Sequence, residues 1–151
     1  MPHSPPTTSA SCALPTSADL VLDTSAAVAL LVEDSTAHLA VHRACAGAVL
    51  GLSGHASAET YSVLTRLPGD NRLTPSAAAR AIRTAFPRSI ALSDEAARGA
   101  VDVLAEARIS GGAVYDGLVA LCARSAGATL VTCDRRALGT YAALGVDVVL
   151  V

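Results

Sequence analysis

Short apolar runs alternate with longer segments of helical periodicity from residue 19 to the end of this chain. We expect the apolar runs to be strands, at 20–22, 48–52, 89–92, 129–132 and 146–150. Strands this apolar are buried on both faces, as in a parallel sheet that is covered by helices. The alternation therefore predicts one α/β domain over residues 19–151.

The segments between these strands carry apolar residues at helical spacing. We expect helices at 24–32, 35–45, 56–67, 75–85, 94–107, 113–126 and 135–144. Thr74, Ser93 and Asp134 stand where a side-chain oxygen would cap the first turn of a helix. Gly127 and Gly145 stand where the last two helices should end. The caps and stops support the same division of the chain.

Residues 1–18 show no such pattern and are rich in Pro, Ser, Thr and Ala. We expect a disordered extension there, outside the folded domain. The longest apolar run, 26–32, is far shorter than the roughly 20 residues that span a bilayer. The N-terminus also lacks a basic segment followed by an apolar one. The expectation is a soluble, cytoplasmic protein with no membrane association.

Composition narrows the classes of function. The net charge of −2 indicates no strongly basic protein that coats nucleic acid. All eleven basic residues are arginine, which excludes phosphate-loop NTPases, Schiff-base enzymes and phosphorylation receiver domains, because each needs a lysine. The four cysteines form no Cys-x-x-Cys pair, so we expect reduced, mostly buried thiols. His38 and His42 share an expected helix face, but no Glu follows His38 as in a metalloprotease helix, and we expect His55 in a loop.

Four acidic residues stand inside apolar or small-residue segments: Asp23, Glu59, Asp116 and Asp134. Asp23 and Asp134 each follow an expected strand, and ligands of parallel sheets bind beyond the carboxyl ends of strands. Glu59 and Asp116 belong to expected helices that can face the same edge. Two charges ~5 Å apart repel by ~3 kcal/mol at an effective dielectric of about 20, and a divalent cation would offset this repulsion. Carboxylates without His or Cys favour Mg²⁺ or Mn²⁺.

Each of these acids also has a purely structural interpretation. Asp23 and Asp134 would equally cap the helices that follow them. Glu59 would equally lie on a solvated helix face. Asp116 is the hardest to assign to solvent, because the helix around it is apolar on nearly every side. Spacing alone therefore predicts a cation site without naming a reaction.

The segments around the acids resemble those of the PIN-domain ribonucleases, and within them the VapC-type toxins of bacterial toxin–antitoxin pairs. The matching motifs are VLDTSA at 21–26, AETYSVL at 58–64, YDGLVA at 115–120 and GATLVTCDRR at 127–136. The resemblance implies a three-layer α/β/α fold with a central, mostly parallel sheet of four to five short strands. Gly117 departs from the family, which commonly has Ala there, and we expect it to soften the helix by under ~1 kcal/mol.

The resemblance also implies a chemistry. The chain would be a single-strand-selective endoribonuclease that depends on Mg²⁺ or Mn²⁺ and attacks an RNA phosphodiester in line with a metal-activated water. The products would carry 5′ phosphate and 3′ hydroxyl ends. The residues at the family's catalytic and metal-binding positions are Asp23, Glu59, Asp116 and Asp134.

Further residues match positions beside the family's metal and substrate. Thr132, Thr24 and Ser25 stand at hydroxyl positions near the metal. Arg135 and Arg136 follow Asp134 directly and are candidates for holding RNA phosphates. With only four aromatic residues in the chain, we expect no extensive base-stacking surface.

The implied partners are RNA, a cognate VapB-type antitoxin that lays an amphipathic segment into an apolar groove, and a second copy of the toxin in a homodimer. Segments 26–32 and 35–45 can line such a groove or serve the core equally well. The alternative function is a catalytically inactive PIN-like interaction module. A phosphatase of the haloacid dehalogenase type fits poorly, because Ser25 stands where that class needs a second Asp and the chain has no lysine.

Overall fold

A single parallel sheet lies at the centre of the computed structural model, which describes residues 18–151. The expected disordered extension at 1–18 lies outside the described residues except for Ala18, which is buried. The strand bounds are β1 Leu20–Leu22, β2 Leu50–Ser53, β3 Arg88–Ile90, β4 Thr129–Thr132 and β5 Val148–Leu150. Their order across the sheet is β3-β2-β1-β4-β5, and every neighbouring pair is parallel. This confirms the expected fold, with five strands among the described residues.

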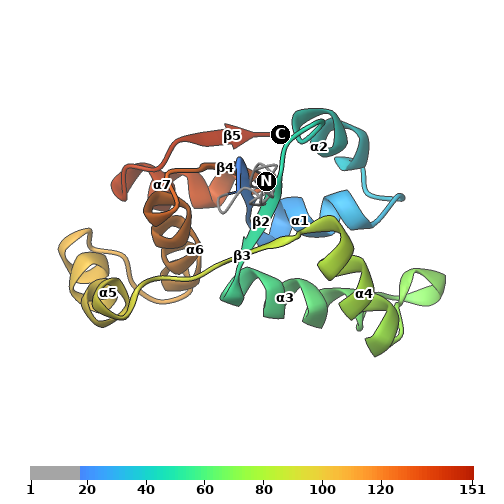
Figure 1. Ribbon diagram of the computed structural model, residues 1–151, viewed down its shortest axis with the longest axis horizontal. Coiled ribbons are helices and arrows are strands. Elements are labelled where there is room, and N and C mark those ends of the chain that lie inside the picture. Colours follow the sequence, from blue (N-terminus) through green and yellow to red (C-terminus); the bar gives the residue numbers. More distant parts are fainter. Residues whose placement is uncertain (1–17) are drawn as a thin grey trace, which may run out of the picture.

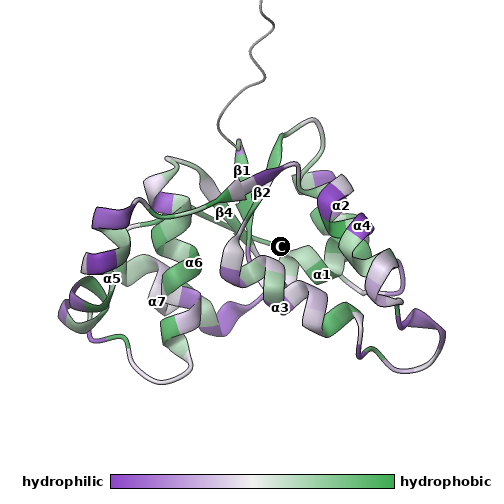
Figure 2. Cartoon of the chain, turned by 60° about the horizontal axis from the view of Figure 1, so that its bottom comes forward, coloured by the Kyte–Doolittle hydropathy of each residue, from purple (hydrophilic) through white to green (hydrophobic). Residues whose placement is uncertain are grey.

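Helices cover both faces of this sheet. Within residues 18–151 they are α1 Thr24–Leu31, α2 His38–Ala44, α3 Gly54–Leu64, α4 Pro75–Ala85, α5 Asp94–Glu106, α6 Ala113–Ser125 and α7 Leu138–Ala143. Helices α5, α6 and α7 gather on one side of the sheet and α1, α2 and α4 on the other (Figures 1 and 2). The arrangement is a three-layer α/β/α sandwich.

The helix boundaries follow local hydrogen bonds. The hydroxyl oxygens of Thr74 and Ser93 accept from first-turn amides of α4 and α5, as expected. Gly127 and Gly145 adopt φ angles of 62° and 67° after α6 and α7, a left-handed conformation that glycine adopts without a steric penalty. The predicted starts and stops are therefore confirmed at these four positions.

Several boundaries differ from the prediction by one to three residues: for example, α2 begins at His38 instead of residue 35, and α3 ends at Leu64 instead of residue 67. Helix α3 begins at Gly54, two residues earlier than expected, because Ser53 Oγ accepts from the amide of Ala56 and caps it. The helix expected at 135–144 starts as a 3-10 turn, Arg135–Ala137, before α7. A short 3-10 turn also forms at Gly69–Asn71. None of these differences changes the order of the elements.

The central strands form the core. Val21 of β1 faces Leu130 of β4 in the ladder, and both side chains are fully buried. Figure 2 shows these strands as hydrophobic and the outer helices as more hydrophilic. At Gly117 in α6, an added Cβ would lie 2.4 Å from Leu104 Cδ2 of α5. The departure from alanine at this position thus has a packing reason, because glycine lets the two helices approach closely.

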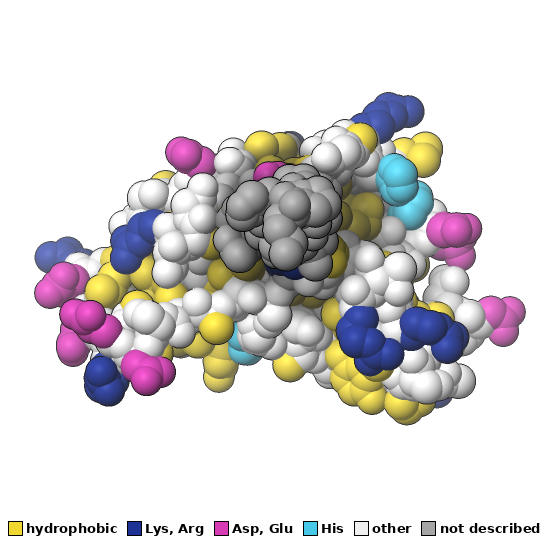
Figure 3. All heavy atoms as spheres, viewed as in Figure 1, with side chains coloured by type: hydrophobic (Ala, Val, Ile, Leu, Met, Phe, Trp, Pro, Cys, Tyr) yellow, Lys and Arg dark blue, Asp and Glu magenta, His cyan; other side chains and the backbone are white. Residues whose placement is uncertain are grey.

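Charged side chains cluster on the surface, and the described cysteines are free. On the face shown in Figure 3, acidic side chains gather over α5 and arginines over α4. Cys45, Cys122 and Cys133 are free, as predicted, and the first two are buried. Between residues 18 and 151, the helices are too short or too polar to cross a membrane.

Candidate active site

Asp23 lies at the carboxyl end of β1, where it caps α1. Its side chain is almost completely buried, and its Oδ1 accepts hydrogen bonds from Ser25 Oγ at 2.6 Å and from the amide of Ala26 at 2.9 Å. Its Oδ2 accepts from the hydroxyls of Thr132 and Tyr141, the latter at 2.9 Å. Four donors therefore surround one buried carboxylate, which fixes its orientation.

The hydroxyls of Ser25 and Thr132 join the ends of β1 and β4. Ser25 Oγ accepts from the amide of Cys133 at 2.9 Å, and Thr132 Oγ1 accepts from the amide of Asp134 at 2.9 Å. The same two hydroxyls donate to Asp23. Because each hydroxyl bridges a carboxylate of one strand end and an amide of the other, the two strand ends are held in a fixed relation.

Asp134 lies just beyond β4 and is bound by an arginine. Its Oδ1 accepts from the backbone amide of Arg136 at 2.9 Å and from Nε at 3.0 Å, while its Oδ2 accepts from Nη2 at 3.0 Å. The Arg136 guanidinium holds the pKa of Asp134 below its usual range. Asp134 therefore caps a 3-10 turn, as its position suggested, and Arg136 is paired with it.

Glu59 and Asp116 come from helices on either side of these strand ends. Glu59 of α3 accepts a hydrogen bond at its Oε2 from Thr24 Oγ1 at 2.6 Å. Asp116 lies in the first turn of α6 and is half-buried. Burial raises the pKa of Asp116, and the charges of Asp23, Asp134 and Glu59 raise it further. The four carboxylates thus lie within one electrostatic environment.

All four acids line one cavity of about 340 Å³. Thr24 and Ser25 contribute hydroxyls to its wall, and Val28, Val63, Val119 and Tyr115 complete it. Oxygen atoms are the only ligands that this wall offers, which suits Mg²⁺ or Mn²⁺ better than Zn²⁺. The ligand atoms of this wall are therefore of the type that a hard divalent cation prefers.

Among residues 18–151, no three His, Cys, Asp or Glu side chains converge tightly enough to form a ready ligand cluster. Protein donors bind three of the four carboxylates: Thr24 binds Glu59, Arg136 binds Asp134, and four groups bind Asp23. The metal-ligand role of the four acids stays a prediction.

Two residues of the site escaped the sequence analysis. Tyr141 of α7 is fully buried and donates to Asp23, and a buried tyrosine hydroxyl normally needs such a partner. His55, expected in a loop, instead lies in the first turn of α3, because Ser53 starts this helix early. Its ring stacks on that of Tyr115, with the centroids 4.9 Å apart.

The remaining candidate residues from the sequence are Arg135, His38 and His42. Arg135 is exposed beside the cavity residue Asp134, and its contact with RNA stays a prediction. His38 Nδ1 lies 3.0 Å from the carbonyl oxygen of Ala29, within hydrogen-bonding distance. The structure offers His38 and His42 no third ligand within the described part of the chain.

Known proteins are similar to this chain in sequence and in fold. The model of the PIN domain family matches residues 20–143. Ribonuclease VapC27 of Mycobacterium tuberculosis is 50% identical over 131 residues, which cover 87% of this chain and 96% of that protein. An identity this high over nearly the whole length of both chains establishes common family membership.

Solved structures agree at the level of the fold. VapC20 of Mycobacterium tuberculosis, a toxin that cleaves the sarcin-ricin loop, superposes with a TM-score of 0.61 at 21% identity and covers 84% of this chain and 95% of its own. A chain of VapBC2 from Rickettsia felis, solved bound to a promoter DNA fragment, gives 0.63 at 14% identity and covers 87% and 98%. The chain therefore belongs to the PIN-domain family and, within it, to the VapC group.

Proposed function

We propose that this chain is a cytoplasmic, Mg²⁺- or Mn²⁺-dependent endoribonuclease toxin that hydrolyses RNA phosphodiester bonds and is inhibited by a cognate VapB-type antitoxin. One observation carries the proposal: four carboxylates line a single cavity, in which burial and the charges of the other three raise the pKa of Asp116. The name of VapC27, a ribonuclease with 50% sequence identity, supports RNA as the substrate.

Electrostatics supports a cation in the cavity. Like charges ~5 Å apart cost ~3 kcal/mol per pair at an effective dielectric of about 20. Asp23 and Asp116 would hold the ion, together with Glu59 and Asp134. Ser25 lines the cavity, and rotation of its hydroxyl would free a lone pair of Asp23. A bound Mg²⁺ or Mn²⁺ would supply positive charge against the phosphate and make a water molecule more acidic.

The protein's own groups would orient and tune these acids. Thr132 and Tyr141 hold Asp23 in one orientation from the side away from solvent. Arg136 keeps Asp134 ionised. Burial and the neighbouring carboxylates raise the pKa of Asp116, which would release its proton when a cation binds, so cation affinity should increase with pH.

The proposal of an antitoxin partner has separate support. VapBC2, which includes a chain of the same fold, is a pair of proteins solved bound to a DNA fragment from their promoter. An apolar hollow of about 350 Å³ is lined by Leu30 and Leu31 of α1 and by Cys45 and Ala46 after α2. Except for Ala46, these residues come from the segments expected to form the groove, although Ala26, Ala27 and Ala29 of α1 serve the core instead. We also propose that two copies of this chain form a homodimer.

The direct test is cleavage of structured RNAs by the purified protein in Mg²⁺, in Mn²⁺ and in EDTA, next to the Asp23→Asn variant. We expect cleavage with either cation, none in EDTA and none by the variant. Sequencing of the new 5′ ends should find 5′ phosphates. Cleavage that persists in EDTA and in Asp23→Asn would refute the metal-dependent mechanism.

The alternative, an inactive PIN-like interaction module, predicts a different result. Such a module would cut no RNA in any cation and would still bind the antitoxin encoded by a short neighbouring reading frame. Co-expression with that product, followed by size-exclusion chromatography with light scattering, measures both the complex and the homodimer. The nuclease proposal further expects that the antitoxin suppresses cleavage.

A further inference from the structure

Two aromatic rings stand together at the edge of the acidic cavity. Tyr115 lines the cavity and directly precedes Asp116 in α6. His55 lies in α3 four residues before Glu59, and its Nε2 is 3.8 Å from Glu59 Oε2. The His55 and Tyr115 rings are nearly parallel, with an interplanar angle of 9° and a centroid distance of 4.9 Å. The two helices that supply cavity carboxylates therefore also supply this stacked pair.

The exposure of the pair sets it apart from a packing contact. Tyr115 is 56% exposed and lies outside the buried core. By contrast, Tyr141 is fully buried and uses its hydroxyl on Asp23. His55 covers one face of the Tyr115 ring, and more than half of Tyr115 is still exposed. A flat apolar surface is thus open to a ligand beside the carboxylates.

His55 also restricts the orientation of that surface. A single exposed tyrosine side chain samples several rotamers and loses this freedom when a ligand binds. A tyrosine ring that a parallel neighbouring ring holds from one side has already lost part of this rotamer freedom. The orientation of the Tyr115 ring is therefore already restricted before any ligand arrives.

A nucleobase is the ligand that matches this geometry. Every base has a flat π face, so stacking on an aromatic side chain tolerates any sequence. A base within a duplex is covered on both faces by its neighbours, whereas an unstacked base in a loop or single strand has a free face. A phosphate near the acids and a base on the adjacent ring would belong to one strand.

We propose that Tyr115, held in place by His55, stacks the base of a nucleotide next to the phosphate that enters the acidic cavity. The pair thereby selects RNA whose bases are unstacked, and Tyr115 is a substrate-binding residue while His55 positions it. This inference rests on the proposed RNA cleavage and adds the contact that orients the strand.

The test measures stacking separately from cleavage. The full chain is mixed in Ca²⁺ with a pool of short single-stranded RNAs that are randomised except for one central 2-aminopurine. Quenching of 2-aminopurine fluorescence reports stacking, and the anisotropy of an end label reports affinity. We expect the wild-type protein to quench the fluorophore, and Tyr115→Leu to abolish the quenching and weaken binding roughly tenfold.

Conservative variants separate stacking from other roles. Tyr115→Phe keeps the ring and should restore both quenching and affinity. His55→Ala removes the support and should give a partial loss, which His55→Phe restores. Tyr61→Leu is the matched control, because Tyr61 is a partly exposed tyrosine of α3 that lines a different hollow. Circular dichroism verifies that each variant is folded.

The outcomes distinguish this inference from the proposed function. Unchanged quenching and affinity in Tyr115→Leu overturn the stacking role, even if the wild-type protein cuts RNA in Mn²⁺. Quenching that depends on Tyr115, in a protein that cuts no RNA, upholds the stacking role and removes the nuclease function. A wild-type chain that does not bind the RNA pool at all overturns the stacking role.

Discussion

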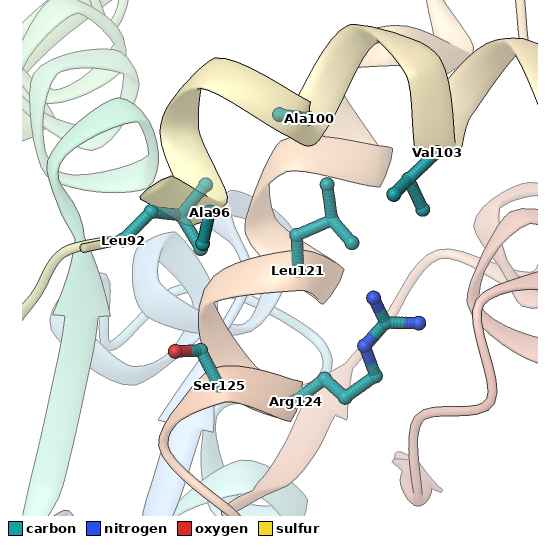
Figure 4. Close-up of a pocket in the computed structure, with 8 residues that line it drawn as sticks. Leu92, Ala96, Ala100, Val103, Leu121, Arg124 and Ser125 are labelled. Carbon is teal, nitrogen blue, oxygen red and sulfur yellow. The ribbon is translucent and has the colours of Figure 1, made fainter. Parts of the chain in front are cut away.

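Helix α6 separates two hollows of similar size and opposite chemistry. Its N-terminal part lines the acidic cavity of about 340 Å³ with Tyr115 and Asp116. Its C-terminal part lines a hollow of about 270 Å³ against α5 with Leu121 and Arg124 (Figure 4). The residues around the second hollow include no carboxylate, imidazole or thiol. The volume of a hollow alone therefore does not identify which of the two is the candidate active site.

The charged groups of the two hollows behave differently. In the acidic cavity, burial and, after it, the neighbouring charges raise the pKa of Asp116. Beside the apolar hollow, Arg124 is the one charged lining residue, and its Nη1 donates to the carbonyl oxygen of Leu144 at 3.0 Å. Carboxylates that repel one another indicate a ligand that would offset their charge, whereas a hydrogen-bonded arginine fixes the local packing.

This difference predicts that the apolar hollow contributes stability and the acidic cavity contributes activity. The largest effect on stability should come from Leu121→Ala, since Leu121 is buried and already borders empty space. We expect the free energy of unfolding to fall by about 2–5 kcal/mol. Urea denaturation measures this loss. Cleavage per folded molecule should stay unchanged, and a fall in specific activity would break the comparison.

Tyr141→Phe tests the buried side of the acidic site. It removes one hydrogen bond to a buried carboxylate, so we expect the free energy of unfolding to fall by about 1.5–3 kcal/mol. Tyr61→Phe, at a partly exposed position, should change it little. Equal losses in the two variants, measured by the same denaturation experiment, would contradict the importance of the hydroxyl for holding Asp23.

Two glycines on the facing helices provide a paired test of packing. Gly117→Ala should lower the free energy of unfolding by about 1 kcal/mol, because overpacking against Leu104 costs ~1–3 kcal/mol and better helix propensity returns ~1 kcal/mol. Gly99→Ala in α5 meets nothing within 4 Å and should raise it by about 0.5–1 kcal/mol. Thermal melts compare the two variants. Stabilisation by both would contradict the close approach of α5 and α6.

The smallest expected effect is a pH dependence of stability in EDTA. The pKa of Asp116 is raised above its ordinary value of 3.8, so the folded state binds this proton more tightly than the unfolded state. Its stabilising contribution is complete below pH 3.8 and is lost as pH rises to the folded pKa. Above that window, Asp116→Asn should be more stable than the wild-type protein, by an amount that solvent screening keeps small.

Denaturation curves at several pH values measure this difference. It should vanish below pH 3.8 and should shrink when Mg²⁺ is added. Asp102→Asn, on the exposed face of α5, serves as the control. A difference that persists at low pH would contradict the assignment to Asp116.

The order of strands and helices could be predicted from the sequence because the apolar runs are separated by clear caps and stops. Asp23 and Asp134 could be placed at one sheet edge, since both follow parallel strands. Boundaries that depend on a single side chain were harder to predict. Ser53 both ends β2 and caps α3, and this places His55 in a helix instead of the expected loop.

The contacts that hold the site could not be predicted in the same way. Tyr141 reaches Asp23 across 118 positions of sequence, and only the folded sheet brings α7 under the end of β1. The bond from Arg136 to Asp134 depends on the 3-10 turn that replaces the expected start of a helix. Gly117 likewise reads as a weak helix position until Leu104 is known to pack against it.

Cation binding tests the central claim most directly. Free Mn²⁺ in titrations of the full chain can be measured by electron paramagnetic resonance, with Mg²⁺ as competitor. We predict that the wild-type protein binds Mn²⁺, that Asp23→Asn and Asp116→Asn weaken binding by at least about tenfold, and that Asp102→Asn does not. Equal Mn²⁺ binding by all four proteins, or none by the wild-type protein, would contradict the account.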